Sequence, residues 1–139
     1  MFYLLFAFLS LNPGQDKVLG EMTGRNFFDL LSNKDWEKAT LLTSDQVNFD
    51  GQLIKTTKKI EKKMQEIIEN HKPELDFTQY FFLSGVESIE KFGELPPRLS
   101  SVNIKKAIVG LARRSKGGVV IFLEKQKDTG YWRITGIHD

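Results

Sequence analysis

The sequence predicts a single α+β domain, with helices in its first half and an antiparallel sheet in its second. Two observations support this class. Between residues 16 and 70 the apolar side chains recur at steps of three and four residues, which is the spacing of amphipathic helices. After Pro97, apolar runs are joined by short turns, and short connections make neighbouring strands antiparallel. A chain of 139 residues is long enough to bury one core.

Three helices are expected in the first half. The first begins near residue 16, and Phe27 lies on its apolar stripe. The second is short, with Asn33 as its N-cap and Trp36 facing inward. The third runs from about residue 56 to residue 70, with its lysines opposite an apolar face.

A short strand pair separates the second helix from the third. Val47 and Phe49 alternate with polar residues, and Asp50-Gly51 follows them. An Asp-Gly pair between alternating strands favours a two-residue hairpin turn, because both turn residues need positive φ angles. The second strand of the pair then resumes at Leu53.

One more strand is expected at about residues 75–83, with Phe81 facing inward, and a helical segment follows it. Ser84 and Glu87 have the spacing of a capping box, and Val86, Ile89 and Phe92 are expected to pack against the core.

Three strands complete the predicted sheet, at about residues 99–113, 118–125 and 131–138. The middle one is apolar on both sides, as expected of a central strand that is covered on both faces. Because alternate residues of a strand point the same way, His138 is expected to share a face with Trp132, Ile134 and Gly136.

Composition excludes several kinds of site. The chain has no cysteine, so disulfides, thiolate metal sites and a cysteine nucleophile are excluded. Only two histidines are present, and neither a metal nor a cofactor is expected. A net charge of +2 gives no electrostatic case for binding nucleic acid.

Residues 1–15 form an apolar N-terminal segment, either a signal remnant or an arm packed on the domain. It is shorter than the roughly 20 residues that a membrane-spanning helix needs. Its length suits the apolar core of a secretory signal, although no basic residue precedes that core. We expect export, to a periplasm or outside the cell, over a cytoplasmic location, with membrane contact only where this segment is retained.

Two stretches resemble the nuclear-transport-factor-2-like superfamily, which includes ketosteroid-isomerase-like and scytalone-dehydratase-like proteins. "FFDLLSNKDWEKATLLTSDQVNFDG" is similar to the two first helices, strand and turn of that family, and "GYWRITGIHD" is similar to its closing strand. The resemblance covers about residues 16–139 and implies a cone-shaped antiparallel sheet curved around about three helices. The segment "SGVESIEKFGELPP" departs from the family pattern.

The same resemblance implies a cavity within the cone and dimerisation through the sheet. The leading hypothesis is a non-enzymatic domain, a homodimer, that binds a small apolar ligand or a protein partner. Its expected ligand pocket draws on residues from the whole chain: Phe27, Trp36, Phe49, Tyr80, Phe122, Trp132 and His138. A closed core with an exposed apolar sheet face would favour a protein-interaction module, and a deep pocket would favour a ligand.

The alternative is an isomerase or a dehydratase-type lyase. It uses Asp50 as general base with Tyr80 or His138 assisting, and it requires a buried Asp50 beside a cavity. Turn chemistry at Asp50-Gly51 and a strand end at His138 are the stronger interpretations. The acid partners that this chemistry needs are also missing, because Phe27 and Phe28 stand where the first helix would offer a tyrosine.

Overall fold

The computed structural model describes residues 13–70, 75–114 and 118–138. The expected apolar segment 1–15 therefore lies outside the described residues, except for its last three positions. Those three begin the first helix, which starts at Pro13 rather than near residue 16. Proline suits this place because the first helical turn leaves its backbone N–H groups without an intrahelical partner.

The order of elements agrees with the predicted α+β class. The helices are α2 (Pro13–Ser32), α3 (Trp36–Thr40), α4 (Thr57–Asn70) and α5 (Gly85–Phe92). The strands are β1 (Thr43–Phe49), β2 (Gln52–Ile54), β3 (Leu75–Ser84), β4 (Ile108–Arg114), β5 (Gly118–Lys125) and β6 (Trp132–His138). Two 3₁₀ turns, η1 (Pro97–Leu99) and η2 (Ile104–Lys106), lie between α5 and β4.

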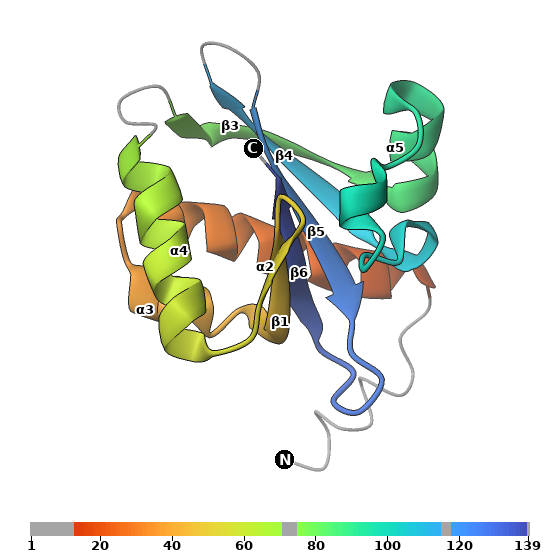
Figure 1. Cartoon of the computed structure of the whole chain (residues 1–139). Helices are drawn as coiled ribbons and strands as arrows, with labels where there is room; N and C mark the ends of the chain where they lie inside the picture. The colour runs from red at the N-terminus through yellow and green to blue at the C-terminus, as the bar shows by residue number, and fades with distance from the viewer. Residues whose placement is uncertain (1–12, 71–74, 115–117, 139) are drawn as a thin grey trace.

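The six strands form one mixed sheet in the order β2-β1-β6-β5-β4-β3. All neighbours are antiparallel except β1 and β6, which run parallel. No short turn joins these two strands, so nothing in the connection forces them to be antiparallel. The sheet is not strongly curled, and the cone form implied by the family resemblance is not seen (Figure 1).

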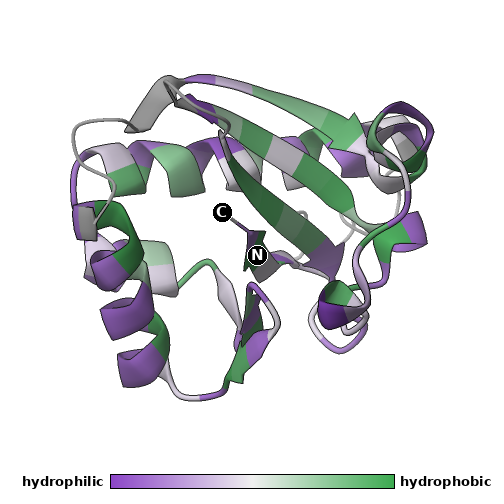
Figure 2. Cartoon of the chain, turned by 45° about the horizontal axis from the view of Figure 1, so that its top comes forward, coloured by the Kyte–Doolittle hydropathy of each residue, from purple (hydrophilic) through white to green (hydrophobic). Residues whose placement is uncertain are grey.

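Helices α2 and α4 pack on one face of the sheet, which we call the helix face (Figure 1). The core there joins Phe27 and Phe28 of α2 to Met64 of α4 and to Ile121 and Ile134 of the sheet. Ile60, Met64 and Ile68 of α4 lie in this core, and the hydrophilic side of the helix faces away from it (Figure 2). Amphipathicity therefore fixes the orientation of α4.

The opposite side of the sheet, the outer face, is covered only in part. A second apolar cluster forms where Leu99 and Val102, from the segment of 3₁₀ turns, pack on Val109 of β4 and Phe122 of β5. Gly85 lets this segment approach α5 closely, because a Cβ there would lie 1.5 Å from the carbonyl oxygen of Ile104.

The sequence predictions for the start of β4, the cap of α3 and the packing of α5 are wrong in part. The strand expected at 99–113 begins only at Ile108, because Pro96 and Pro97 and the two 3₁₀ turns occupy its first part. The capping residue of α3 is Asp35, whose side chain accepts a hydrogen bond from the backbone of Lys38, and not Asn33. Helix α5 is capped by Ser84 as expected, but Val86 and Phe92 are exposed rather than packed.

Candidate functional site

The turn between β1 and β2 holds the first candidate residue, Asp50. Asp50 has a φ of 54° and Gly51 a φ of 101°, and Phe49 pairs with Gln52 across them. Two consecutive positive φ angles are those of the hairpin turn that Asp-Gly favours, so the turn prediction is confirmed. The backbone N–H of Asp50 also donates to the carbonyl of Ile137 on β6, 3.1 Å away.

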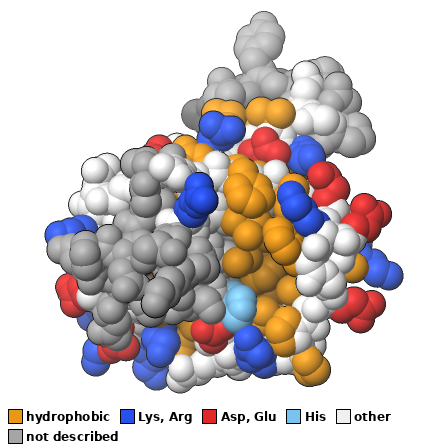
Figure 3. All heavy atoms as spheres, turned by 90° about the horizontal axis from the view of Figure 1, so that it is seen from above, with side chains coloured by type: hydrophobic (Ala, Val, Ile, Leu, Met, Phe, Trp, Pro, Cys, Tyr) orange, Lys and Arg blue, Asp and Glu red, His pale blue; other side chains and the backbone are white. Residues whose placement is uncertain are grey.

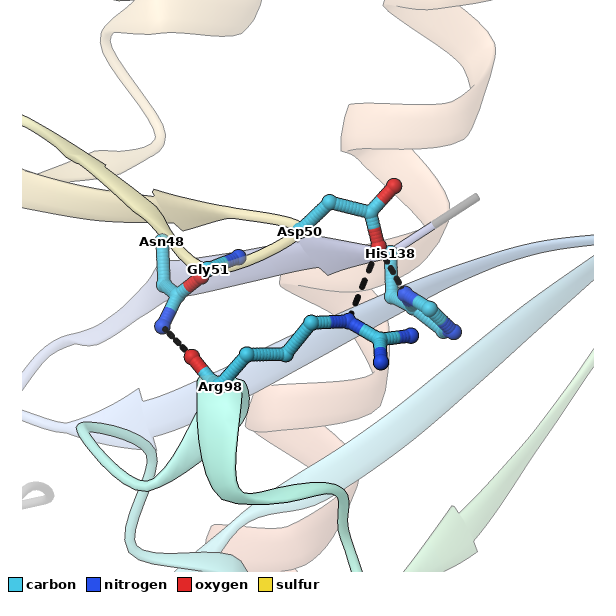
Figure 4. A network of polar contacts seen from close by, with 5 residues as sticks. All are labelled: Asn48, Asp50, Gly51, Arg98 and His138. Atoms are coloured by element: carbon cyan, nitrogen blue, oxygen red, sulfur yellow. Dashed lines mark hydrogen bonds and ion pairs between the residues drawn. The ribbon is translucent and has the colours of Figure 1, made fainter.

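A buried amide fixes this turn to the outer segment. Asn48 is 2% exposed, and its Oδ1 accepts from the backbone N–H of Gly51 at 2.6 Å. Its Nδ2 donates to the carbonyl oxygen of Arg98 at 3.0 Å (Figure 4). The same Nδ2 also donates to Oγ of Ser101 at 2.8 Å. The side-chain amide therefore has partners at both ends, as a buried polar group requires.

The carboxylate of Asp50 meets two cationic or basic side chains. Its Oδ1 contacts Nδ1 of His138 and lies 4.0 Å from Nε of Arg98 (Figure 4). A carboxylate oxygen accepts, so Nδ1 of the imidazole is the donor and Nε2 points away from this contact. Asp50 and His138 are thus brought together, although they are 88 positions apart in the sequence.

The side chain of Asp50 is nevertheless 45% exposed, and that of His138 is 27% exposed. Asp50 lies at the tip of a turn and is not enclosed by a cavity.

A bulge in β6 decides which way His138 faces. Gly136 pairs with Phe122 and Ile134 pairs with Leu123, so Thr135 has no position opposite it on β5. Trp132 and Ile134 consequently face the helices, whereas Gly136 and His138 face outward. The expectation that all four share one face is wrong, because one extra residue reverses the alternation of a strand.

His138 ends a line of side chains that crosses four strands on the outer face. Phe81 of β3 pairs with Leu111 of β4, Leu111 with Val120 of β5, and Val120 with His138 of β6. We call Phe81, Leu111 and Val120 the outer row. Figure 3 shows the hydrophobic side chains of this side as a band that reaches the histidine.

The outer row lines an open hollow of about 410 Å³ at the end of the sheet. Its lining comes from three neighbouring strands: Gln79, Tyr80, Phe81, Leu111, Ala112, Arg113, Gly118 and Val120. Phe81 is 49% exposed, so the prediction that it faces inward is wrong. The register places Tyr80 and Phe82, rather than Phe81, toward the helices.

Tyr80 lies on the helix face and is partly buried in the core there. Its ring stacks on that of Phe28, with centroids 5.3 Å apart, and the guanidinium of Arg25 lies 5.8 Å from its centroid. Tyr80 and the Asp50–His138 pair therefore face opposite sides of the sheet, and the phenol does not approach Asp50.

The helix face is closed over the part of the chain that the structure describes. The hollow between α2, α4 and the sheet measures about 10 Å³, which is the size of a single water. Phe27 and Phe49 lie within this core, and Trp36 and Trp132 pack at its border.

The seven residues expected to form a ligand pocket are therefore divided between the two faces. Five of them, counting Tyr80, lie on the helix side, whereas Phe122 and His138 lie on the outer side. Neither the hollow beside the outer row nor the small hollow on the helix side is lined by members of both groups.

A second open hollow, of about 430 Å³, lies beside the turn between β5 and β6 and is more polar. Its lining combines Lys106, Lys125 and Lys127 with Glu124, and the ammonium of Lys125 is 3.2 Å from the carboxylate of Asp16. Mixed and partly paired charges give this hollow no clear preference for one kind of ligand.

Within the described ranges, no group of three or more histidine, aspartate or glutamate side chains is placed to hold a metal ion. None of the described helices combines the length and hydrophobicity of a membrane span. Comparison with known proteins gives no family model, curated protein or solved structure that matches the chain significantly.

The sequence contains little that would have revealed the outer row. Phe81, Leu111 and Val120 are apolar residues within apolar runs, and such residues normally belong to the core. Arg98 immediately precedes the strand that the sequence predicts at about 99–113, and nothing in the sequence indicates its approach to Asp50.

Proposed function

We propose that the chain is a nuclear-transport-factor-2-like domain that acts as a protein-interaction module and binds its partner through the outer row. The family part of this proposal is supported by the order of elements, two helices, a strand pair, a helix and then a sheet that ends the described chain. The interaction part is supported by the contrast between the two sides of the sheet.

The single observation that carries the proposal is that the closed core and the open apolar surface lie on opposite faces. The hollow lined by Leu31, Met64 and Ile68 on the helix side measures about 10 Å³, whereas the hollow that the outer row lines measures about 410 Å³. Fully burying a phenylalanine or leucine is worth about 1.5–3 kcal/mol relative to leaving it exposed. A partner that covers the outer row gains much of that free energy, which a solvated surface does not provide.

The geometry favours a protein over a small apolar ligand. Ligand sites typically enclose at least about 70% of a drug-sized molecule. The outer row instead forms a shallow floor across β3, β4 and β5, and its aromatic member is half exposed. A broad floor of this kind matches the centre of a protein interface better than it matches a ligand pocket.

The isomerase or lyase alternative has less support. A general base of this class needs a water-excluded site, and Asp50 is 45% exposed at a turn. Tyr80, one of its two assisting residues, is on the other face of the sheet. The contact between Asp50 and His138 fits a role in fixing the β1–β2 turn against the end of β6.

Photo-crosslinking in the host cell tests the proposal. The substitution Phe81→p-benzoylphenylalanine places a reactive aromatic ring on the outer row with little change of shape. Tyr131→p-benzoylphenylalanine is a matched control, because Tyr131 is 48% exposed, close to the 49% of Phe81, and lies in the turn before β6.

We expect a discrete protein adduct with the probe at position 81 and none with the probe at 131. Equal labelling at both positions, or no adduct at 81, would overturn the proposal. A small molecule that native mass spectrometry finds bound to the unaltered chain, but not to Leu111→Asp, would replace it with a ligand-binding function.

A further inference from the structure

The two edges of the sheet differ in their protection against pairing with a further strand. Strand β2 forms one edge and has three residues, and a very short strand protects an edge. Strand β3 forms the other edge and has ten residues. Residues 79–83 include no charged side chain and no proline, which are two further means of blocking an edge. The register shift of β3 lies before Tyr80, and residues 80–84 pair regularly with β4. This stretch of β3 is therefore an edge without the usual protection.

Exposure agrees with an uncovered edge. None of residues 79–84 is buried, whereas four of the five residues 108–112 on the neighbouring β4 are. Helix α2 approaches this part of β3 from the helix face, where the guanidinium of Arg25 lies 6.0 Å from the ring centroid of Phe82. Among the described strands, none pairs with the other side of β3. The backbone of β3 is therefore accessible from this side.

The ladder between β3 and β4 shows which backbone groups of β3 face the free edge. Ser84 pairs with Ile108, and one residue further the N–H of Gly85 donates to the carbonyl of Ala107 at 2.8 Å. Residues 85 and 107 continue the same register, so they form a hydrogen-bonded pair. In an antiparallel ladder, such pairs alternate with pairs that exchange no hydrogen bond.

Counting back from residue 85 assigns the remaining pairs. Leu83 and Phe81 exchange hydrogen bonds with β4, and Tyr80 and Phe82 do not. The N–H and C=O groups of Tyr80 and Phe82 therefore point to the free edge. No hydrogen bond to these groups is formed within the described part of the chain. Two donors and two acceptors are thus available within three residues.

We propose that β3 of a second copy of this chain pairs with this edge, antiparallel and centred on Phe81, so that two copies share one continuous sheet. A twofold axis at Phe81 places Tyr80 of each copy opposite Phe82 of the other. Each of these two pairs exchanges two hydrogen bonds, so every free group named above has a partner. The homodimer expected from the family resemblance is thereby assigned to the edge of the sheet and not to its face.

The register centred on Phe81 makes the best use of the regular part of β3. A twofold axis at Tyr80 pairs Phe82 with residue 78, which lies within the register shift. An axis at Phe82 pairs Tyr80 with Ser84, which is the N-cap of α5. Only the axis at Phe81 keeps both hydrogen-bonded pairs within residues 80–82.

The side chains in this register suit close pairing. Phe81, which is 49% exposed, meets its counterpart on the outer side, and aromatic pairs across strands are stabilising. Residues 79–83 are uncharged, so the ladder places no like charges opposite each other there. Lys91, whose ammonium is 6.0 Å from the ring centroid of Phe81, is exposed, and its long side chain can turn toward solvent. The same short stretch is therefore complementary to itself.

The inference rests on the proposed function and completes its binding surface. The outer row of one copy crosses three strands, which is about 10 Å at the spacing of a sheet. Pairing at Phe81 joins the outer rows of two copies end to end, and the resulting line of six apolar side chains is about 24 Å long. A partner protein would then bind across the twofold axis, on a floor to which both copies contribute.

Single cysteines test the register, because the unaltered chain has none. Phe81→Cys places two thiols in a pair that is not hydrogen-bonded, with Cα atoms about 4.5 Å apart. This separation lies within the range of roughly 4.4–6.8 Å that a disulfide bridges. Gln79→Cys is the matched control on the same strand and side, since its two copies lie about 13 Å apart in this register. We expect mild oxidation to give a covalent dimer with Phe81→Cys and none with Gln79→Cys.

Sedimentation velocity tests whether this contact holds the dimer together. We expect the unaltered chain to be dimeric at about 100 µM, above the micromolar Kd of the weaker specific interfaces. Phe81→Lys should raise the Kd at least about tenfold, because two lysines replace two apolar rings at the axis. Leu53→Lys on β2 is the control, since Leu53 is 44% exposed at the opposite edge, and it should change the Kd by less than about twofold. Circular dichroism melting establishes that both variants are folded.

Three outcomes would overturn the inference: a monomer at about 100 µM, a dimer that Phe81→Lys leaves unchanged, and a disulfide that forms as readily at position 79 as at 81. The proposed function is judged separately, from adducts with proteins other than a second copy. A monomeric chain that still gives such an adduct at position 81 retains the proposed function with a single outer row. A dimer paired at Phe81 without any such adduct retains the pairing and loses the proposed function.

Discussion

The side chain of Asn48 is expected to be one of the largest single polar contributions to the stability of this domain. Asn48→Ala removes three hydrogen bonds, to the N–H of Gly51, the carbonyl of Arg98 and the hydroxyl of Ser101. A typical hydrogen bond contributes about 0.5–1.5 kcal/mol, and a buried group left without its partner costs more. We therefore expect a loss of about 3 kcal/mol in the free energy of unfolding.

Urea unfolding followed by tryptophan fluorescence measures this loss. A protein of this size typically has about 5–15 kcal/mol of stability, so the variant should remain folded. Its Tm should fall by about 10 °C. Ser101→Ala is the control, because it removes only one of the three bonds at an exposed residue and should cost less than about 1 kcal/mol.

A loss below about 1 kcal/mol for Asn48→Ala, with an unchanged denaturant slope, would refute this reasoning. It would mean that water replaces the amide at the turn, and that the segment around Arg98 is held mainly by its apolar contacts. A changed slope would instead indicate that the substitution alters the compactness of one of the two states.

Three more expectations can be checked on purified protein. Gly85→Ala should lower the Tm by more than about 10 °C, because the new Cβ would meet the carbonyl of Ile104. Gly130→Ala is the control: Gly130 has a φ of 74° and open space around its Cβ position, so the free energy of unfolding should fall by only about 1 kcal/mol. Equal losses of stability in the two variants would refute the close approach at Gly85. Phe122→Ala should lower the free energy of unfolding by about 3–5 kcal/mol because the ring is buried, and Phe81→Ala should lower it by less than about 1.5 kcal/mol. If urea unfolding gives the reverse order, Phe81 belongs to the core. Hydrogen bonds from Ser84, and then the charge of Lys17, lower the pKa of Glu87. Ionised Glu87 therefore stabilises the folded chain at pH values above the ordinary pKa of a glutamate, and this contribution is lost as the pH falls through the lowered pKa. Ser84→Ala should raise the pKa of Glu87 measured by NMR titration, and an unchanged pKa would show that the cap is not formed in solution.

The parts of the fold that follow from local sequence were predictable. The hairpin turn needs two residues with positive φ angles, and few residue pairs adopt them as easily as Asp50-Gly51. The dipeptide therefore predicts the turn and the two strands that flank it. The three-residue spacing of Ser84 and Glu87 likewise locates the start of α5. In both cases the controlling interaction lies within a few residues of chain.

The candidate site was not predictable to the same degree, because its geometry depends on contacts between distant segments. The choice between Phe81 and its neighbours Tyr80 and Phe82 is one example. All three are aromatic, and the register with β4 together with the packing against Phe28 and Arg25 of α2 turns Tyr80 and Phe82 inward. A pattern of three consecutive aromatic residues contains no alternation from which the inward face can be inferred.

The bulge at Thr135 shows how strongly the outer face depends on a single residue. With regular alternation from Ile134, His138 would face α2 and α4, and the imidazole would lie in an apolar core without its contact to Asp50. The extra residue instead keeps Ile134 and Ile137 both in the core. Gly136 meets Val102 and Phe122 on the outer side, where a Cβ would lie 3.0 Å from each of them. The bulge thus satisfies the core and the outer segment together, and it places His138 beside Val120 at the end of the outer row. The position of the Asp50–His138 contact therefore follows from the packing of its neighbours, which agrees with a structural role for the pair. The outer row, and not this pair, is accordingly the surface through which we propose that the chain binds a partner.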